Sequence, residues 1–251
     1  NPTAFLFLID QSGSMADQAG NLMMSKAQFV ADALNRVVMN LISRSSKAEG
    51  VRDYFDIGVI GYGGNGIQNP LQGAFSSRIF NKVSMFEKFP IVVENRVQKR
   101  TDSLGRTSEK KIKFPVWFVP EAKGNTPMKE AIKFAALELA TWCNDHSSSY
   151  PPTVLHVTDG ESSDGDPEPT AEQLRNISTD DGQVLLFNQC LPHGNIVNQE
   201  KETRWSLNCR FKGVFTPYND KKIGEFFEPI TLRKISVDGM KYELPKIDEK
   251  G

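Results

Sequence analysis

The sequence contains few cysteines and few histidines. Its 251 residues include three cysteines, Cys143, Cys190 and Cys209, and three histidines. An odd and sparse set of thiols does not suit a scaffold held together by disulfides, and it is typical of proteins kept in a reducing compartment. The composition therefore favours a cytoplasmic protein whose stability comes from a packed core.

Long hydrophobic runs and a strong net charge are also absent. No apolar run approaches the roughly 18 residues that span a membrane, and the run over 4–9 is too short and lacks the basic flank of a signal peptide. The formal net charge is -1 and the pI is about 6.4. This balance argues against bulk binding to nucleic acid or to an anionic membrane. Because the first residue is Asn1 rather than Met, removal of a leader stays an open question.

Two Cys-x-x-His pairs have the spacing of zinc ligands. They are Cys143 with His146 and Cys190 with His193, and together they offer a four-ligand site. The structural interpretation is stronger, because Cys143 ends a helical apolar stripe and His193 lies between a proline and a glycine in a predicted turn. We therefore expect no zinc site.

Strands and helices alternate along the chain. The apolar run over 4–9 is typical of a strand buried on both faces, and apolar residues at helical spacing predict a long helix over 23–44. Further strands are predicted over 54–64, 151–160, 183–188 and 211–215, and further helices over 128–142 and 170–177. This alternation predicts an α/β fold with a mostly parallel central sheet and helices on both faces.

Five oxygen-bearing side chains fall at one predicted edge of this sheet. Asp10 follows the first strand and is joined by Ser12 and Ser14, Thr126 precedes a helix, and Asp159 follows the strand "TVLHVT". Ligand sites of open α/β sheets lie outside the carboxyl ends of the strands, and magnesium prefers about six oxygen ligands. The five residues therefore predict a site for a hard cation, with Asp10 at an exposed strand end.

Each of these residues also has a structural interpretation. Ser12 and Ser14 suit the start of the following helix, and Thr126 before Pro127 suits an N-cap with proline at the first helical position. Asp159 with the following glycine is an ordinary turn pair. A coincidence of all five residues at one sheet edge is better explained by a metal site.

The same residues resemble a known motif. "DQSGS", the threonine of "GNTP" and the aspartate of "VTDG", in this order, are similar to the metal-ion-dependent adhesion site of von Willebrand factor A domains. The resemblance implies that Ser12 and Ser14 bind the metal directly and that Thr126 binds it directly or through water. It implies that Asp10 and Asp159 act mostly through water. The implied cation is Mg²⁺, with Mn²⁺ or Ca²⁺ as alternatives.

The resemblance also implies a domain organisation. A von Willebrand A domain, with its Rossmann-like fold, would cover residues 1–228, with an insertion at about 64–123, and residues 229–251 form a tail without an assigned role. "KFPVWF", "GNTPMKEAI" and "HVTDGESSDGDP" resemble intracellular bacterial members, including the tellurite-resistance-associated group. Domains of that kind often accompany protein kinases and metal-dependent phosphatases. A scaffold in a signalling or stress-response system is therefore expected.

The ligand set favours binding over catalysis. Hydroxyls are neutral ligands, so they leave the cation free to accept an Asp or Glu of a protein partner. No histidine lies in the three loops, and a hydrolase would need a general base near the metal. Ser12 replaces the second aspartate of "DxDx[TV]" phosphatases, and neither "GxSxG" nor a phosphate-binding loop occurs. A metal-dependent hydrolase or phosphatase is the alternative.

A basic hairpin is predicted within the insertion. The segment 93–120 reads as two extended arms around a turn at 103–105. Its basic residues are Arg96, Lys99, Arg100, Arg106, Lys110, Lys111 and Lys113. If the hairpin enters the metal edge, Arg100, Arg106 and Lys110 would attract an acidic partner. The alternatives are charges that merely protect an edge strand and, less favoured, binding of nucleic acid.

An acidic loop follows Asp159 directly. Glu161, Asp164, Asp166 and Glu168 lie within ten residues of it. Such a run is more often a solvated loop, and the alternative is a second cation site.

Overall fold

The computed structural model describes residues 1–20, 22–101 and 107–190. These residues belong to the first of two units into which the chain divides, Asn1–Ile196 and Val197–Gly251. The predicted strand over 211–215, the predicted domain boundary at 228 and the tail over 229–251 lie outside the described residues.

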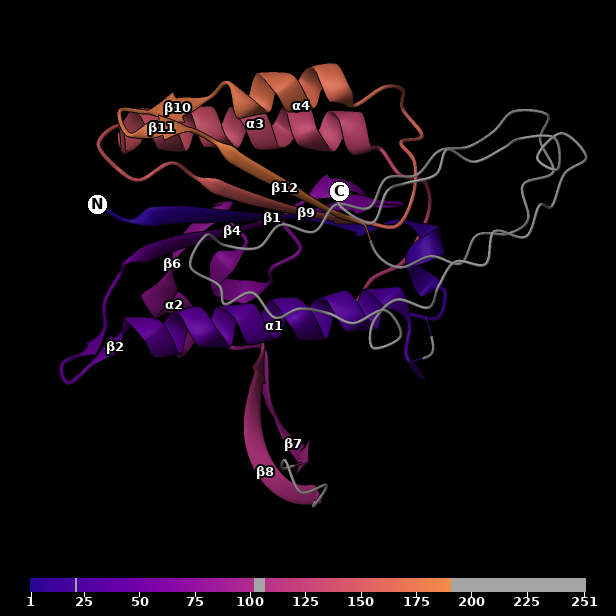
Figure 1. Cartoon of the computed structure of the whole chain (residues 1–251), viewed down its shortest axis with the longest axis vertical. Coiled ribbons are helices and arrows are strands. Elements are labelled where there is room, and N and C mark those ends of the chain that lie inside the picture. The colour runs from indigo at the N-terminus through magenta and orange to yellow at the C-terminus, as the bar shows by residue number, and fades with distance from the viewer. Residues whose placement is uncertain (21, 102–106, 191–251) are drawn as a thin grey trace, which may run out of the picture. The chain divides into compact units, whose positions relative to one another are not determined.

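A mixed, mostly parallel sheet forms the centre of the described unit (Figure 1). Its parallel strands are β1 (Thr3–Gln11), β4 (Phe55–Gly63), β9 (Thr153–Thr158) and β12 (Leu185–Cys190). The order is β12-β9-β1-β4, and two short antiparallel strands, β5 (Gly66–Gln68) and β6 (Phe80–Lys82), pair with β4. The predicted α/β fold is confirmed at this level.

Alternate residues of β1 pack into two separate cores. Leu6 and Leu8 belong to the core on one face of the sheet, whereas Phe7 and Ile9 belong to the core on the other. A strand with apolar side chains on both faces must be covered on both, which explains the continuous apolar run in the sequence.

Helices cover the two faces of the sheet (Figure 1). One face carries α1 (Lys26–Ser45) and α2 (Val83–Lys88), and the other carries α3 (Met128–Asp145) and α4 (Glu168–Arg175). The side chain of Ser25 accepts a hydrogen bond from the Gln28 N–H and caps α1. The predicted helices are confirmed to within a few residues at each end.

Shorter elements complete the described unit. They are the 3₁₀ turns η1 (Gly13–Ala16) and η2 (Gly73–Phe75), the two-residue strand pair β2 (Ser46–Lys47) and β3 (Gly50–Val51), and the pair β10 (Ser178–Thr179) and β11 (Gly182–Gln183). The predicted insertion at 64–123 therefore contributes to the sheet and the core before its hairpin begins, since it contains β5, η2, β6 and α2.

The predicted hairpin is present as β7 (Val92–Thr101) paired with β8 (Thr107–Val116). Its base is held against α1: the Asn35 side chain donates to the Phe118 carbonyl at 2.8 Å, and Arg96 pairs with Asp32 at 3.0 Å. The Arg96 guanidinium also lies 3.8 Å from the centre of the Phe114 ring.

The position of the hairpin differs from the expectation. Figure 1 shows it standing out from the α1 side of the unit, away from the sheet, rather than entering the edge at which the metal site is predicted. The reason is the anchor on α1, where buried Asn35 accepts hydrogen bonds from the N–H groups of Trp117 and Phe118 at 2.9 and 3.0 Å.

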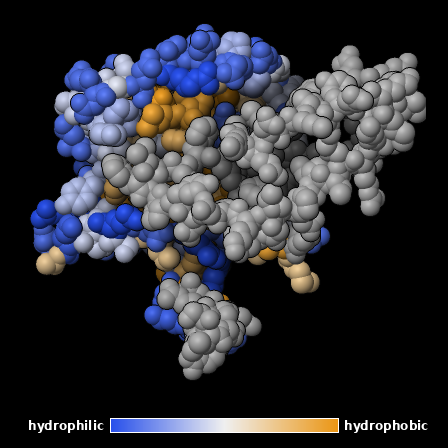
Figure 2. Space-filling view, in the orientation of Figure 1, coloured by the Kyte–Doolittle hydropathy of each residue, from blue (hydrophilic) through white to orange (hydrophobic). Residues whose placement is uncertain are grey.

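Two surfaces of the unit differ in polarity. Figure 2 shows hydrophilic side chains over the outer surface of the α3–α4 layer and an apolar area beside it. Strand β12 lies at one end of the described sheet, and its Leu185 and Phe187 are 46% and 43% exposed.

Candidate metal site at the carboxyl edge of the sheet

Asp10 and Asp159 meet because β1 and β9 are parallel neighbours. Asp10 lies at the end of β1, and Asp159 directly follows the end of β9. The expectation that Asp10 is exposed is wrong, because only 1% of its surface is accessible. Its Oδ1 accepts from the Ser12 N–H at 2.8 Å, and its Oδ2 accepts from Thr158 Oγ1 at 2.7 Å.

Ser14 contacts Asp159, and the Ser12 hydroxyl lies beside that of Ser14. The Ser12 and Ser14 hydroxyl oxygens lie 3.1 Å apart, and the Ser14 hydroxyl donates to Asp159 Oδ1 at 2.8 Å. Ser12 precedes the turn η1, but its side chain makes no capping hydrogen bond there. The structural interpretation of the two serines as helix starters is therefore not supported, since α1 is capped by Ser25.

The loop that carries Thr126 is fastened to the loop that carries the serines. The Gly13 N–H donates to the Gly124 carbonyl at 2.8 Å, and the Lys123 N–H donates to the Gln11 carbonyl at 2.7 Å. Gly124 has a φ of +72°, and a Cβ there would lie 2.3 Å from Cα of Gly64. Only glycine fits this position without strain.

Thr126 does not cap α3. The cap position is taken by Pro127, and the helix begins at Met128. Its first turn is instead capped by Asp164, which accepts from the N–H groups of Lys129 and Glu130 at 3.0 and 2.9 Å. The Thr126 N–H donates to the Ser163 hydroxyl at 3.0 Å, and the Thr126 carbonyl accepts from the Ser163 N–H at 2.9 Å. The residue is half-buried, and its hydroxyl makes no hydrogen bond to any described residue. Its side chain is therefore available to a ligand.

The donor set fits a small divalent cation. Two cis ligands of an octahedral Mg²⁺ at about 2.1 Å are separated by about 3.0 Å, and the two serine hydroxyls are 3.1 Å apart. Both Asp10 oxygens already accept hydrogen bonds, which suits a carboxylate that acts through water. The described residues contain no group of three His, Cys, Asp or Glu that could hold a metal, so any cation here would depend on hydroxyls.

Lys26 is a member of the site that the sequence pattern did not reveal. Its Nζ lies 2.6 Å from Asp159 Oδ2 and 3.4 Å from Asp17 Oδ2. Burial alone lowers the pKa of Lys26, but the hydrogen bond and charge of Asp159, followed by those of Asp17, outweigh it and raise the pKa above 10.5. The only signal in the sequence is a lysine at the first position of the helix that follows the motif.

A second set of polar side chains lies beneath Asp10. The Tyr62 hydroxyl is 2.7 Å from Nε2 of His156, whose Nδ1 is 3.0 Å from Oδ1 of Asn188. Burial and then the charge of Asp10 raise the pKa of Tyr62, and burial lowers the pKa of His156. Both ring nitrogens of His156 are engaged, so this histidine serves the core.

The acidic loop after Asp159 is used for local structure. Asp164 caps α3 and also accepts from the Ser162 hydroxyl at 2.6 Å. Asp166 accepts from the Glu168 N–H at 3.0 Å, and the Glu168 carboxylate pairs with Arg175 at 2.8 Å. In the described part of the chain these carboxylates do not converge, and the expected alternative of a second cation site gains no support.

The first of the two zinc-spaced pairs lies in α3 and its end. Cys143 is buried and unpaired, while His146 Nδ1 lies 2.9 Å from the Trp142 carbonyl and its ring stacks on that of Trp142 with centres 4.5 Å apart. His193 and the side chain of Cys190 lie outside the described residues. The geometry of Cys143 and His146 agrees with their structural interpretation.

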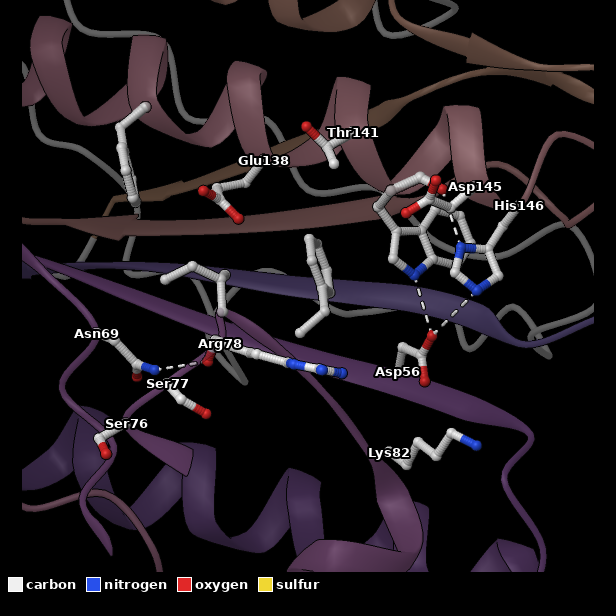
Figure 3. A pocket seen from close by; sticks show the side chains of 14 residues that line it. Asp56, Asn69, Ser76, Ser77, Arg78, Lys82, Glu138, Thr141, Asp145 and His146 are labelled. Atoms are coloured by element: carbon white, nitrogen blue, oxygen red, sulfur yellow. Dashed lines mark hydrogen bonds and ion pairs between the residues drawn. The ribbon is translucent and has the colours of Figure 1, made fainter. Parts of the chain in front are cut away.

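His146 also borders a pocket of about 750 Å³. Figure 3 shows Glu138, Thr141 and Asp145 reaching into it from α3 and Asp56 facing them from β4. Asp56 accepts from Trp142 Nε1 at 3.0 Å. It lies opposite Ala4 in the sheet, about 20 Å along β1 from Asp10 at 3.3 Å per residue. The pocket is therefore separate from the candidate metal site.

The hairpin residues predicted to bind a partner are only partly described. Lys110 is exposed and lies opposite Gln98 in the β7–β8 ladder. The backbone of Arg100 pairs with Ser108, and its side chain and the whole of Arg106 lie outside the described residues. Their interactions stay a prediction.

The comparisons with known proteins add nothing to the resemblance to von Willebrand A domains, whose only support is the motif in the sequence. No protein-family model and no curated protein matches the chain. In the described ranges, no helix is both long and apolar enough to cross a membrane.

Proposed function

We propose that this chain contains a von Willebrand A-like domain that binds a protein partner through a divalent cation. The cation is held by Asp10, Ser12, Ser14, Thr126 and Asp159. The observation that carries the proposal is the 3.1 Å separation of the Ser12 and Ser14 hydroxyls beside Asp159. This spacing suits Mg²⁺ better than Ca²⁺, whose bonds of about 2.3–2.6 Å would spread the ligands. Mn²⁺ is the alternative.

Each residue has a separate task in this proposal. A bound cation would supply a Lewis-acidic position for an Asp or Glu side chain of the partner. Ser12 and Ser14 are direct ligands, and Ser14 is exposed on the side that a partner can reach. Asp10 and Asp159 orient the serines: Asp10 accepts from the Ser12 N–H, and Asp159 accepts from the Ser14 hydroxyl. Neutral hydroxyls leave most of the cation's charge available to the partner.

Binding, rather than catalysis, is the proposed activity. A hydrolase needs a base within hydrogen-bond reach of the attacking group. Support comes from His156, the described histidine that senses the charge of Asp10, because both its ring nitrogens are engaged, one by buried Tyr62 and the other by Asn188. The metal-dependent hydrolase stays the alternative.

The proposed partner is a protein with an exposed acidic group. The resemblance to intracellular bacterial domains supports a scaffold for signalling or stress response, with a protein kinase or phosphatase as the partner. Arg100, Arg106 and Lys110 would form a second contact, separate from the metal edge because the hairpin is anchored on α1. Nucleic acid is the less favoured partner of this hairpin.

An affinity capture experiment tests the proposed function. The immobilised chain is incubated with extract of its source cells in buffer containing magnesium or EDTA, and retained proteins are identified. We expect a set of proteins that is retained only with magnesium and is lost with Ser14→Ala. Retention of the same proteins in both buffers would show that a metal bridge is not the mechanism.

A further inference from the structure

Lys26 places a buried positive charge beside the proposed cation. The side chain of Lys26 is 9% exposed and that of Asp159 is fully buried, and their charged atoms are 2.6 Å apart. A lysine is almost never buried without a partner. Lys26 Nζ also lies 3.4 Å from the Ser14 carbonyl oxygen, so the ammonium is held by the loop that carries the proposed ligands.

The two oxygens of Asp159 are divided between the serine and the lysine. Oδ1 accepts from the Ser14 hydroxyl at 2.8 Å, and Oδ2 accepts from the Lys26 ammonium at 2.6 Å. Lys26 therefore fixes the carboxylate in an orientation in which Oδ1 faces the serines. It also neutralises much of the negative charge that Asp159 would present to a cation.

The formal charges show what this neutralisation does. Among the buried side chains, Asp10 and Asp159 carry two negative charges and Lys26 carries one positive charge, which gives a net charge of -1. Asp17, the other carboxylate near Lys26, lies in solvent with its side chain 70% exposed and is screened. A divalent cation then gives the loaded site a net charge of +1. Without Lys26 the loaded site would be neutral. The lysine thus opposes the cation and favours any anion that follows it, since unit charges a few Å apart still interact appreciably in a partly buried site.

We propose that Lys26 is a positioning residue that weakens divalent-cation binding and strengthens the binding of a carboxylate to the metal-loaded site. The inference rests on the proposed function and assigns a regulator to the same site. Ligand charge is a general means of setting metal affinity in oxygen-ligand sites. Here the positive charge belongs to Lys26, which contacts the carboxylate of Asp159 rather than the metal.

The test uses Lys26→Met with magnesium chloride and sodium acetate as probes. Calorimetry should show about tenfold tighter magnesium binding than in the unmodified chain, because one opposing unit charge has been removed. Acetate titrated into the magnesium-loaded chain and followed by NMR shifts should bind more weakly, by about the same factor. A purely structural role of Lys26 would weaken both binding steps together.

Two further variants keep the test decisive. Lys123→Met removes an exposed lysine from the same sheet edge, and we expect both affinities to stay within about twofold of the unmodified chain. Lys26→Gln removes the charge but keeps a donor for Asp159, so it replaces Lys26→Met if that variant does not fold. Like Lys26→Met, Lys26→Gln should bind magnesium more tightly and bind acetate more weakly than the unmodified chain.

The outcomes separate this inference from the proposed function. Magnesium binding by the unmodified chain together with unchanged or weaker binding by the folded Lys26 variants would overturn the inference alone. Absence of magnesium binding in the unmodified chain and in both variants would overturn the proposed function and the inference with it.

Discussion

At the scale of single residues, Asp10 has a structural role in the motif loop besides its proposed role in metal binding. Its carboxylate accepts hydrogen bonds from the Ser12 N–H and the Thr158 hydroxyl, and it is almost fully buried. It therefore holds the motif loop in place, in addition to its proposed part in metal binding. Substitutions that preserve shape and those that do not should have different consequences.

Asp10→Asn should weaken magnesium binding by at least about tenfold, because a negative charge next to the cation is lost. Asp10→Ala should also lower the free energy of unfolding by about 2–4 kcal/mol, because two buried donors lose their acceptor. Calorimetry with magnesium and urea unfolding measure the two effects. Magnesium affinity in Asp10→Asn equal to that of the unmodified chain would contradict the metal assignment.

Gly124→Ala should destabilise the loop that carries Thr126. The φ of +72° and the approach of Cα of Gly64 leave no room for a methyl group, so we expect a loss of about 1–3 kcal/mol in the free energy of unfolding. Gly160→Ala is the control, since a Cβ at Gly160 meets no atom within 4 Å. Equal stability of the two variants in urea would show that the Gly124 loop is not constrained in this way.

The sequence made part of the site predictable at this scale. The five proposed oxygen ligands lie at strand ends or precede a helix, and four of them, Asp10, Ser12, Ser14 and Asp159, are linked by hydrogen bonds. Lys26 was not predictable, because a lysine at the start of a helix usually points to solvent. Its contact with Asp159 depends on the way α1 approaches the end of β9.

At the scale of elements, the start of α3 depends on a residue far away in the sequence. Asp164 accepts from the N–H groups of Lys129 and Glu130, and a carboxylate at a helix N-terminus is favourable for the helix dipole. The contact also fastens the acidic loop to the helix that follows Thr126. The expected N-cap at Thr126 is thus replaced by one from a neighbouring loop.

Asp164→Asn should lower the free energy of unfolding by about 1 kcal/mol at neutral pH, because an asparagine offers one oxygen to the two N–H groups and carries no charge for the helix dipole. Burial raises the pKa of Asp164, but hydrogen bonds from Ser162, Glu130 and Lys129 outweigh it, so the pKa lies below 3.8. The contribution of the carboxylate is therefore complete well above pH 3.8 and declines as the pH falls below it. Urea unfolding at several pH values should show the two chains converging in acid.

Asp145→Asn is the matched control for this prediction. Asp145 ends the same helix, where a negative charge opposes the dipole, so its removal should leave stability unchanged or slightly higher. If Asp164→Asn and Asp145→Asn behave alike at neutral pH, the capping role of Asp164 is wrong.

Long elements were predictable from the sequence and short ones were not. The runs that became β1 and β4 are almost continuously apolar or small, and the run that became α1 keeps helical spacing of its apolar residues over 20 residues. The strands β5 and β6 have only three residues each, too few for a period to be recognised. The direction of the β7–β8 hairpin depends on Asn35 and Asp32 of α1, a tertiary contact with no local signal.

At the scale of the whole described unit, the two ends of the sheet have different chemistry. The carboxyl end gathers hydroxyls, two buried aspartates and Lys26. The opposite end carries the pocket in which Asp56 contacts Trp142. Because the strands run parallel, their carboxyl ends meet at one edge, and the order β12-β9-β1-β4 makes the two central strands, β9 and β1, the source of both aspartates.

The most direct test of the account is a calorimetric titration of magnesium chloride into the chain and into Ser12→Ala/Ser14→Ala. The control is Ser76→Ala/Ser77→Ala, an exposed serine pair that borders the pocket at the other end of the sheet. We predict one magnesium bound by the unmodified chain and by the control, and none by the Ser12 and Ser14 variant. Equal magnesium binding by all three chains, or none by the unmodified chain, would contradict the account.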